Sequence, residues 1–239
     1  MGYRARTHQD GSALRQDVIT ACQILAQQRL VEGFGHVSAR IPNSDLFLLT
    51  PRVSLELVRS KDLLVLNLKG ETVQGEKSPP FEAPLHAAIL RARPDVNAVA
   101  RFHGRKANCF GASRRKLHPV HNHGSFFFGG VPVFPESDLI STPALAERVA
   151  TILGKKPAVL LRGNGQVTVG KGIPAAIMMA IYLEETADIY YAALQIGTPV
   201  LLTAEQSRSR RQETLSAIDL ERAWNFFSQK AQTGKKVKE

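Results

Sequence analysis

Hydrophobic residues follow two different periods along this chain, and the two periods predict different elements. Apolar residues three and four positions apart indicate amphipathic helices, whereas alternating or short continuous apolar runs indicate strands. Helices are expected over residues 11–31, 81–93, 142–156, 173–197 and 217–231, with a short helix or turn over 107–116. Strands are expected within residues 32–42, 45–51, 62–76, 96–102, 129–135 and 158–170.

The lengths of the connections favour one α/β domain with a largely antiparallel or mixed sheet. Lys69-Gly70 and the "RGNG" turn at Arg162 join neighbouring strand runs over hairpin distances. Such short connections join antiparallel strands, because a parallel crossover needs a dozen or more residues. We therefore treat residues 1–239 as a single domain, with residues 1–10 and 231–239 as flexible tails.

Composition narrows the class of protein. Apolar residues make up 44% of the chain and charged residues 22%, as in ordinary globular proteins. No window approaches the ~20 apolar residues that a membrane span requires, and no apolar secretory segment is visible near the N-terminus. The two cysteines are too few for a disulfide framework. We expect a cytoplasmic protein with reduced thiols and no membrane partner.

The net charge of +10 raises nucleic acid as a partner. The basic residues are spread thinly, however, and their short runs are not interleaved with stacking aromatic residues. The charge serves equally well to attract an anionic small molecule. We therefore expect a small anionic substrate and no nucleic acid.

Polar residues with catalytic potential cluster where the expected strands and helices begin or end. Glu82 and His86 are four residues apart, which places them on one face of a helix. His103 follows a buried strand, and His121 and His123 share one side of their segment if it is extended. Arg162 and Asn164 occupy the "RGNG" turn.

Each of these features also has a purely structural interpretation. An H-x-H pair such as His121 and His123 is a metal signal, but a weak one by itself. His86 is typical of a packed histidine, and Glu82 can simply favour the start of a helix. Asn164-Gly165 is an ordinary hairpin signal. No single site decides between these interpretations.

The order and spacing of the motifs are more informative. The series "GHVSAR", "TPR", "DLLVLNLKGETVQGE", "PPFEAPLHAAILRARPDVNAVARFHG", "GVPVF" and "AVLLRGNGQVTVG" resembles the class II aldolase/adducin family over residues 12–230. This resemblance implies a three-layer α/β/α sandwich around a mostly antiparallel sheet. It also implies a homotetramer with active sites between subunits.

The resemblance further implies a divalent metal held by three histidines and a glutamate that acts as acid and base. The glutamate position is Glu82, and one histidine position is His103. Arg101 and Asn164 stand at the other two histidine positions. Arginine has no lone pair to offer a metal, and asparagine is a weak oxygen ligand. We therefore expect either no cofactor or one divalent ion (Mn, Fe or Zn), with His103, His121 and His123 as its candidate ligands.

Departures from the family pattern also bear on the substrate. His36 stands where sugar-phosphate aldolases of the family have asparagine, and Pro79-Pro80-Phe81 replaces their paired serines. The chain looks instead like the branch of hydroxypyridine and hydroxyphthalate dicarboxylate decarboxylases and prenylated hydroxyphenylpyruvate oxygenases. This implies a carboxylated aromatic or enolisable hydroxy-acid substrate.

The leading hypothesis is a carbon–carbon lyase, a decarboxylase or aldolase-like enzyme, with two versions left open: Arg101 replaces the charge of the metal, or His103, His121 and His123 hold a displaced metal ion. Glu82, His103 and Arg101 are the predicted catalytic residues. The predicted substrate-binding residues are His36, Ser38, Arg162, Asn164, His121 and His123. The alternatives are a non-catalytic adducin-like binding or assembly module, in which Arg101 only pairs with Glu82, and an oxygenase or isomerase on the same scaffold.

Overall fold

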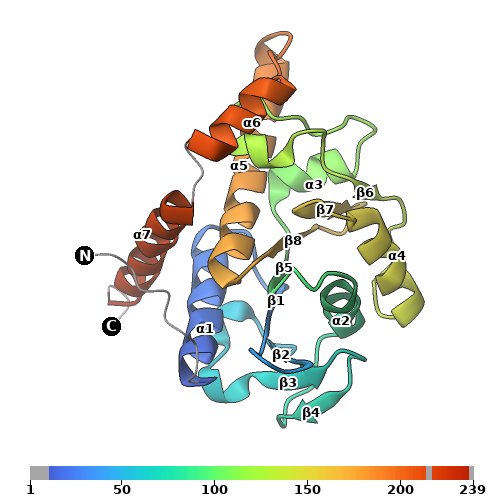
Figure 1. The fold of residues 1–239 in the computed structure, drawn as a ribbon, viewed down its shortest axis with the longest axis vertical. Helices are drawn as coiled ribbons and strands as arrows, with labels where there is room; N and C mark the ends of the chain where they lie inside the picture. The colour runs from blue at the N-terminus through green and yellow to red at the C-terminus, as the bar shows by residue number, and fades with distance from the viewer. Residues whose placement is uncertain (1–10, 214–216, 237–239) are drawn as a thin grey trace.

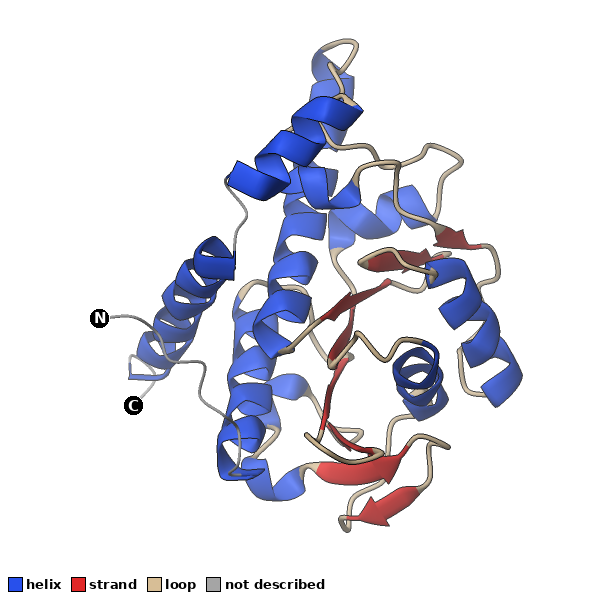
Figure 2. Ribbon diagram, in the orientation of Figure 1, coloured by secondary structure: helices blue, strands red, loops and turns tan. Residues whose placement is uncertain are grey.

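The structure is a computed structural model that describes residues 11–213 and 217–236. One eight-stranded sheet, in the order β4-β3-β2-β1-β5-β8-β7-β6, forms its centre (Figures 1 and 2). Neighbouring strands run antiparallel except for β6 and β7, which pair in parallel. The strands are β1 His36–Arg40, β2 Leu46–Leu49, β3 Leu64–Asn67, β4 Thr72–Gln74, β5 Ala98–Phe102, β6 Val133–Phe134, β7 Ala158–Leu161 and β8 Gln166–Gly170.

Helices cover both faces of this sheet. The α-helices are α1 Gly11–Gln27, α2 Ala83–Ala92, α3 Arg105–Gly111, α4 Pro143–Leu153, α5 Ile173–Ile196, α6 Ala204–Glu213 and α7 Ala217–Lys236. The short 3-10 helices are η1 Leu55–Leu57, η2 Ser60–Asp62 and η3 His123–Phe127. Helices α1 and α5 lie against one face, and α2 and α4 against the other (Figure 1). The three-layer α/β/α sandwich with a mostly antiparallel sheet is therefore confirmed.

The side-chain alternation of the strands divides the core into two hydrophobic clusters. On β5, Ala98 and Ala100 pack with the α1 and α5 side, whereas Val99 packs with the α2 and α4 side. Because successive strand residues point to opposite faces, Arg101 shares the face of Val99. Arg101 is thus directed towards the layer that contains α2.

Helix boundaries depart from the predicted ones at a few positions. The first helix ends at Gln27, and Arg29 just beyond it has a positive φ of 56°. Helix α4 follows the prediction closely: the Thr142 hydroxyl accepts a hydrogen bond from the Leu145 amide, and Gly154 ends the helix at φ 51°.

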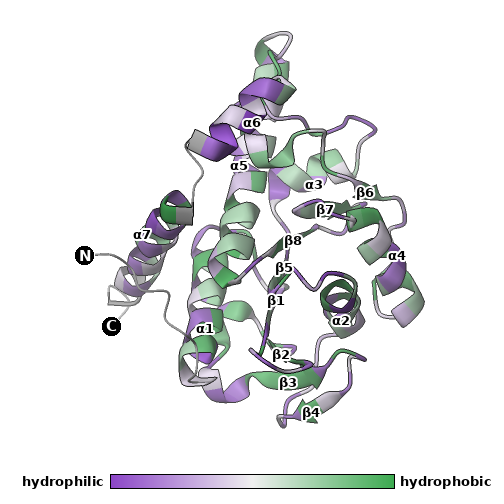
Figure 3. Cartoon of the chain, in the orientation of Figure 1, coloured by the Kyte–Doolittle hydropathy of each residue, from purple (hydrophilic) through white to green (hydrophobic). Residues whose placement is uncertain are grey.

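The C-terminal region contains the other differences. Helix α6 was not expected, because its polar sequence has no apolar periodicity (Figure 3 shows purple stretches along it). Residues 231–236 continue α7 where a tail was predicted, and the rest of the predicted tails, residues 1–10 and 237–239, lie outside the described residues. None of the helices in the described ranges is long and apolar enough to cross a membrane.

Candidate active site

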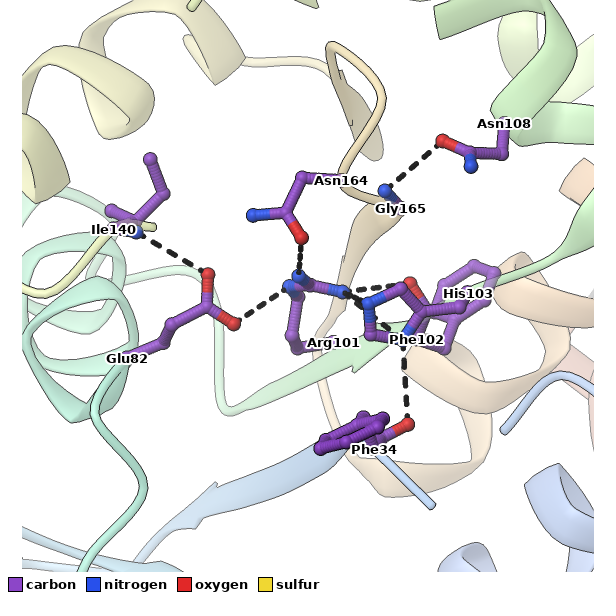
Figure 4. Close-up of polar contacts among 9 residues, drawn as sticks. All are labelled: Phe34, Glu82, Arg101, Phe102, His103, Asn108, Ile140, Asn164 and Gly165. Carbon is purple, nitrogen blue, oxygen red and sulfur yellow. Dashed lines mark hydrogen bonds and ion pairs between the residues drawn. The ribbon is translucent and has the colours of Figure 1, made fainter. Parts of the chain in front are cut away.

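Arg101 lies at the centre of the polar cluster between β5 and α2 (Figure 4). Its side chain is 1% exposed, and its Nε atom lies 3.1 Å from Oε2 of Glu82 in a buried ion pair. Nη2 donates to Oδ1 of Asn164 at 3.1 Å. Nη1 donates to the Phe102 carbonyl at 3.0 Å and lies 3.0 Å from Nε2 of His103. Of the four side chains that the family resemblance singles out, three therefore meet around the guanidinium group of the fourth, Arg101.

Three elements bring these side chains together. Glu82 is the residue immediately before α2, where a carboxylate suits the helix dipole. Asn164 lies in the β7–β8 turn between Gly163 (φ 65°) and Gly165 (φ 80°), conformations that glycine adopts without strain. A side chain at Gly165 would collide with the Phe102 carbonyl and with Nη1 of Arg101. The turn can therefore approach β5 closely only because residue 165 is glycine.

Backbone and side-chain contacts fix the position of His103 at the end of β5. Its amide donates to the Leu30 carbonyl at 2.8 Å, and its Nδ1 lies 3.3 Å from the Phe34 carbonyl. Arginine can only donate hydrogen bonds, so Nε2 of His103 must accept from Arg101. The proton of the neutral ring then belongs on Nδ1, which donates to Phe34.

The chain that follows His103 is held by two side chains, the buried Gln166 and the half-buried Glu184. Gln166 accepts from the Gly104 amide at 2.8 Å and donates to its carbonyl at 3.1 Å. Glu184 on α5 accepts from the Lys106 and Ala107 amides at 2.7 and 3.0 Å, which satisfies the first turn of α3. His103 is therefore held by a rigid surrounding structure.

The electrostatics of the cluster keep its imidazole ring neutral. Burial, together with the positive charge of Arg101, lowers the pKa of His103 to about 4. Burial also lowers the pKa of Arg101 from its ordinary value, although the Glu82 carboxylate opposes this shift. A guanidinium stays protonated at neutral pH even so. At neutral pH the site therefore presents a buried cation next to a neutral histidine.

A second cluster of polar residues, His36, Ser38 and His86, lies next to Arg101 on β1 and α2. His36 is the register partner of Arg101 across β1 and β5, and its ring lies 5.8 Å from that of His86. The Ser38 hydroxyl lies 2.7 Å from Nδ1 of His86, and both side chains are fully buried. Burial is the main cause that lowers the pKa of His86 to about 3 and that of His36 well below its ordinary value. His86 is thus a packed histidine, bonded to a serine side chain.

The other residues predicted to bind substrate lie elsewhere. Arg162 is exposed and lines an open cavity of about 920 Å³ together with Arg114, Lys116 and Lys156. His121 and His123 lie against α5 and next to each other, with ring centroids 5.9 Å apart. Their segment is not extended, since η3 begins at His123, so the predicted alternation does not apply.

A cavity of about 300 Å³ opens beside His103. Arg29 and Arg105 line it together with Phe34, whose side chain is 79% exposed. Arg29 contributes from a backbone conformation (φ 56°) that residues other than glycine rarely adopt. This cavity gives a small molecule access to the histidine, while Arg101 stays behind it.

The donor set around Arg101 does not fit a divalent metal. Of the family's three ligand positions, only His103 supplies a nitrogen lone pair, and that lone pair accepts from Arg101. The amide oxygen of Asn164 also accepts from Arg101. A metal ion here would have to displace a buried guanidinium, so the family's metal position does not suit one in this chain.

Sequence reasoning missed several residues of this neighbourhood. Gln166 and Asn108 lie in ordinary strand and helix patterns, and Asn108 accepts from the Gly165 amide at 3.1 Å. Glu184 and Glu185 lie within a long apolar helix. Two adjacent carboxylates on a mostly apolar helix were the signal that could have found them.

The chain is similar to known proteins in sequence. A family model described as the Class II Aldolase and Adducin N-terminal domain matches residues 16–191. A 3,4-dihydroxyphthalate decarboxylase from Terrabacter sp. (strain DBF63) is 32% identical over 201 residues, covering 78% of this chain and 82% of that protein. A 5-deoxy-D-ribulose 1-phosphate aldolase from Bacillus thuringiensis serovar kurstaki is 28% identical, covering 80% of this chain and 91% of that protein.

Solved structures share the fold. The structure described as L-fuculose 1-phosphate aldolase from Glaciozyma antarctica PI12 superposes with a TM-score of 0.84 and 21% identity. The match covers 99% of this chain and 95% of that chain. At this identity the likeness establishes the architecture. The curated relatives described above are a decarboxylase and an aldolase, both of which cleave carbon–carbon bonds.

Proposed function

Because the chain belongs to the class II aldolase and adducin family, we propose that it is a carbon–carbon lyase that uses a buried guanidinium where its relatives' pattern calls for a metal. The observation that carries this proposal is the convergence of Glu82, His103 and Asn164 on Arg101. The proposed substrate is an aromatic or enolisable hydroxy acid with at least one carboxylate, in keeping with the dihydroxyphthalate decarboxylase among the relatives.

The proposed substrate lies in the 300 Å³ cavity beside His103. Arg29 and Arg105 bind its carboxylates, because a guanidinium matches a carboxylate with two parallel hydrogen bonds. His103 is the group that touches the reacting part of the substrate. Its Nδ1–H, which donates to the Phe34 carbonyl in this structure, donates instead to the substrate oxygen conjugated with the breaking bond.

In the proposed reaction, the bond between the substrate carbon and its carboxylate breaks and carbon dioxide leaves. The electron pair moves onto the conjugated oxygen, where the His103 N–H stabilises the developing negative charge. On an enolisable substrate a proton from water then replaces the carboxylate on carbon. On an aromatic substrate that proton is added first, to the carbon that bears the carboxylate, so that the neighbouring oxygen is a ketone when the bond breaks and becomes the hydroxyl of the product. A neutral imidazole with a lowered pKa is suited to this donating role, as in other enzymes that polarise an oxygen with uncharged histidine.

Arg101 and Glu82 are positioning residues in this scheme. Arg101 fixes the tautomer of His103 and adds a buried positive charge behind it, where low polarity strengthens its field. Glu82 was predicted to act as acid and base, but both of its carboxylate oxygens have partners. Oε2 pairs with Arg101, and Oε1 accepts a hydrogen bond from the Ile140 amide at 3.4 Å. We therefore assign Glu82 the task of holding the guanidinium in place.

The test is an activity assay with 3,4-dihydroxyphthalate as the substrate, in which chromatography detects the product that has lost one carboxylate. L-fuculose 1-phosphate serves as the comparison substrate. Decarboxylation that persists after treatment with a chelator is expected. His103→Ala should lower kcat by about 10²–10⁴-fold, as for loss of an acid–base or polarising group. Arg105→Gln should raise KM more than it lowers kcat, and Arg115→Gln, an exposed arginine outside the cavity, is the control.

Three outcomes would contradict the proposal. Full activity in His103→Ala would remove the proposed polarising group. Loss of activity on chelation, restored by a divalent ion, would show that the reaction uses a metal. If substrates of this class bind without turnover, the binding-module alternative takes the place of the lyase.

We also propose that the protein forms a homo-oligomer. Phe34 and Phe81 are 79% and 61% exposed, and Phe34 lines the cavity at His103. Large exposed aromatic residues beside a site are typical of surfaces that another molecule covers. A monomer on sizing chromatography with light scattering would contradict this assignment.

A further inference from the structure

A second cluster of metal-ligating groups lies between η3 and α5, outside the site around Arg101. His121, His123 and Glu185 each offer a ligand atom, and these atoms all lie within 4.8 Å of one another. Nδ1 of His123 lies 2.8 Å from Oε2 of Glu185. His103, which sequence reasoning grouped with these histidines, does not belong to this cluster.

One hydrogen-bond chain fixes the tautomer of His121. The Thr186 hydroxyl is fully buried and donates to the Tyr182 carbonyl at 2.6 Å, because a carbonyl can only accept. The hydroxyl oxygen must then accept from Nε2 of His121, which lies 3.0 Å away. The Nε2–H tautomer leaves the lone pair of Nδ1 free for a ligand. Metal-binding histidines commonly donate their other ring N–H to such a partner.

The remaining groups are also held in place. The His123 ring stacks on Tyr182, with centroids 4.2 Å apart and planes 20° apart. Tyr182, Glu185 and Thr186 are three and four residues apart on α5, so one helical surface supports the whole cluster. His123 and Glu185 remain 39% and 38% exposed, which leaves access for an ion from solvent.

We propose that His121, His123 and Glu185 bind one divalent transition-metal ion, with Zn²⁺ as the representative ion. Two imidazoles and one carboxylate form a ligand set that suits such ions and leaves at least one coordination position open. The ion takes the place of the proton that His123 shares with Glu185, and the proton moves to Nε2 of the ring. The bound metal joins η3 to α5. This inference does not rest on the proposed lyase activity.

The experiment measures metal binding directly. Purified protein, stripped with a chelator and dialysed, is titrated with Zn²⁺ by calorimetry, and Co²⁺ is used as a spectroscopic probe of the ligands. One ion per chain is expected. Glu185→Gln is the decisive variant, because Glu185 lies 62 residues from His123 in sequence and only the folded chain brings the two together. Zn²⁺ affinity should fall by about tenfold or more.

One further variant and one control sharpen the result. Thr186→Val keeps the shape of the side chain but removes the acceptor of the His121 N–H, and should weaken Zn²⁺ binding by about 10–100-fold. Asp188→Asn makes the same carboxylate-to-amide change as Glu185→Gln at an exposed position on the same helix and should leave Zn²⁺ affinity unchanged. Circular dichroism of each stripped variant establishes that it is folded.

Several results would overturn the proposal. Zn²⁺ binding that is unchanged in Glu185→Gln would place the ion on the histidine-rich segment alone. Binding that is lost in His103→Ala but kept in His123→Ala would place it at the family position. Absence of binding to the stripped wild-type chain at millimolar Zn²⁺ would exclude the site.

Discussion

Replacing Arg101 with methionine tests whether the guanidinium and Glu82 form a buried ion pair. The side chains of Arg101 and Glu82 are 1% and 5% exposed, so solvent cannot hydrate the carboxylate that the substitution leaves behind. Removing one member of such a pair typically costs about 3–5 kcal/mol, because the remaining charge stays buried without a partner. For a chain of this size each kcal/mol lowers Tm by about 2–4 °C, so we expect a decrease of roughly 6–20 °C.

The assay is urea unfolding of a double-mutant cycle. It compares Arg101→Met, Glu82→Gln and the double variant, which carries no buried charge at these two positions. The double variant should be less destabilised than the sum of the single changes, since the largest cost comes from the orphaned charge. Arg91→Met is the matched control, because Arg91 pairs with Glu147 at 2.9 Å while their side chains are 45% and 62% exposed. That surface pair should contribute about 0–1 kcal/mol.

A second measurement separates electrostatics from packing. The charge of Arg101 is one of the causes that lower the pKa of His103 to about 4. NMR titration of His103 should therefore show a higher pKa in Arg101→Met, and Arg91→Met should leave it unchanged. If Arg101→Met costs no more than Arg91→Met, or if the pKa of His103 does not rise, the proposed role of the buried guanidinium is refuted.

Three other outcomes can be measured. In the folded chain the pKa values of His86 and His103 are lowered from 6.5 to about 3 and about 4, so the unfolded chain binds more protons below pH 6.5. The urea concentration at the midpoint of unfolding should therefore decrease as pH falls from 6.5 towards 4. An unchanged midpoint at pH 5 would contradict the conclusion that both histidines are buried in the neutral form. Gly165→Ala should destabilise the chain by at least about 1–2 kcal/mol through its φ of 80° alone, and should also disturb the site because the new methyl group meets the Phe102 carbonyl. The double change Arg101→His with Asn164→His should create a Zn²⁺ site at the family's metal position. Zn²⁺ binding is measured by calorimetry in a chain that also carries His123→Ala, so that the second cluster of metal-ligating groups does not contribute. If the double change adds no Zn²⁺ binding, the identity of the two replaced ligands is not the sole reason that the family position excludes a metal.

The hydrophobic pattern predicted the α/β class and most of the elements, and the family resemblance implied the three layers. Alternating or continuous apolar runs predicted the strand regions of the sheet, because most strands present their apolar side chains to a covered face. The exposed edge strand β4 was predicted through the tight turn at Lys69-Gly70 that joins it to β3. Cap signals such as Thr142 and Gly154 determined the ends of α4, since they act on the backbone within a few residues. Helix α6 was missed because its residues show no apolar period.

Motif order also identified the positions of Glu82, Arg101, His103 and Asn164, but not what they do to one another. The contacts of Glu82 and Asn164 with the same guanidinium depend on the folded structure, because sheet pairing and helix placement bring together residues 19 and 63 positions away from Arg101. The same holds for the lowered pKa of His103, which arises from burial and a neighbouring charge.

The cluster of His121, His123 and Glu185 shows the limit of sequence reasoning most clearly. His121 and His123 were visible as an H-x-H pair, yet their predicted third partner was His103. The fold supplies Glu185 instead, because α5 runs past η3 and turns that carboxylate towards His123. Local pattern fixes which residues are available for chemistry, whereas long-range packing decides which of them meet, because a contact across 62 residues leaves no periodic signal in the chain.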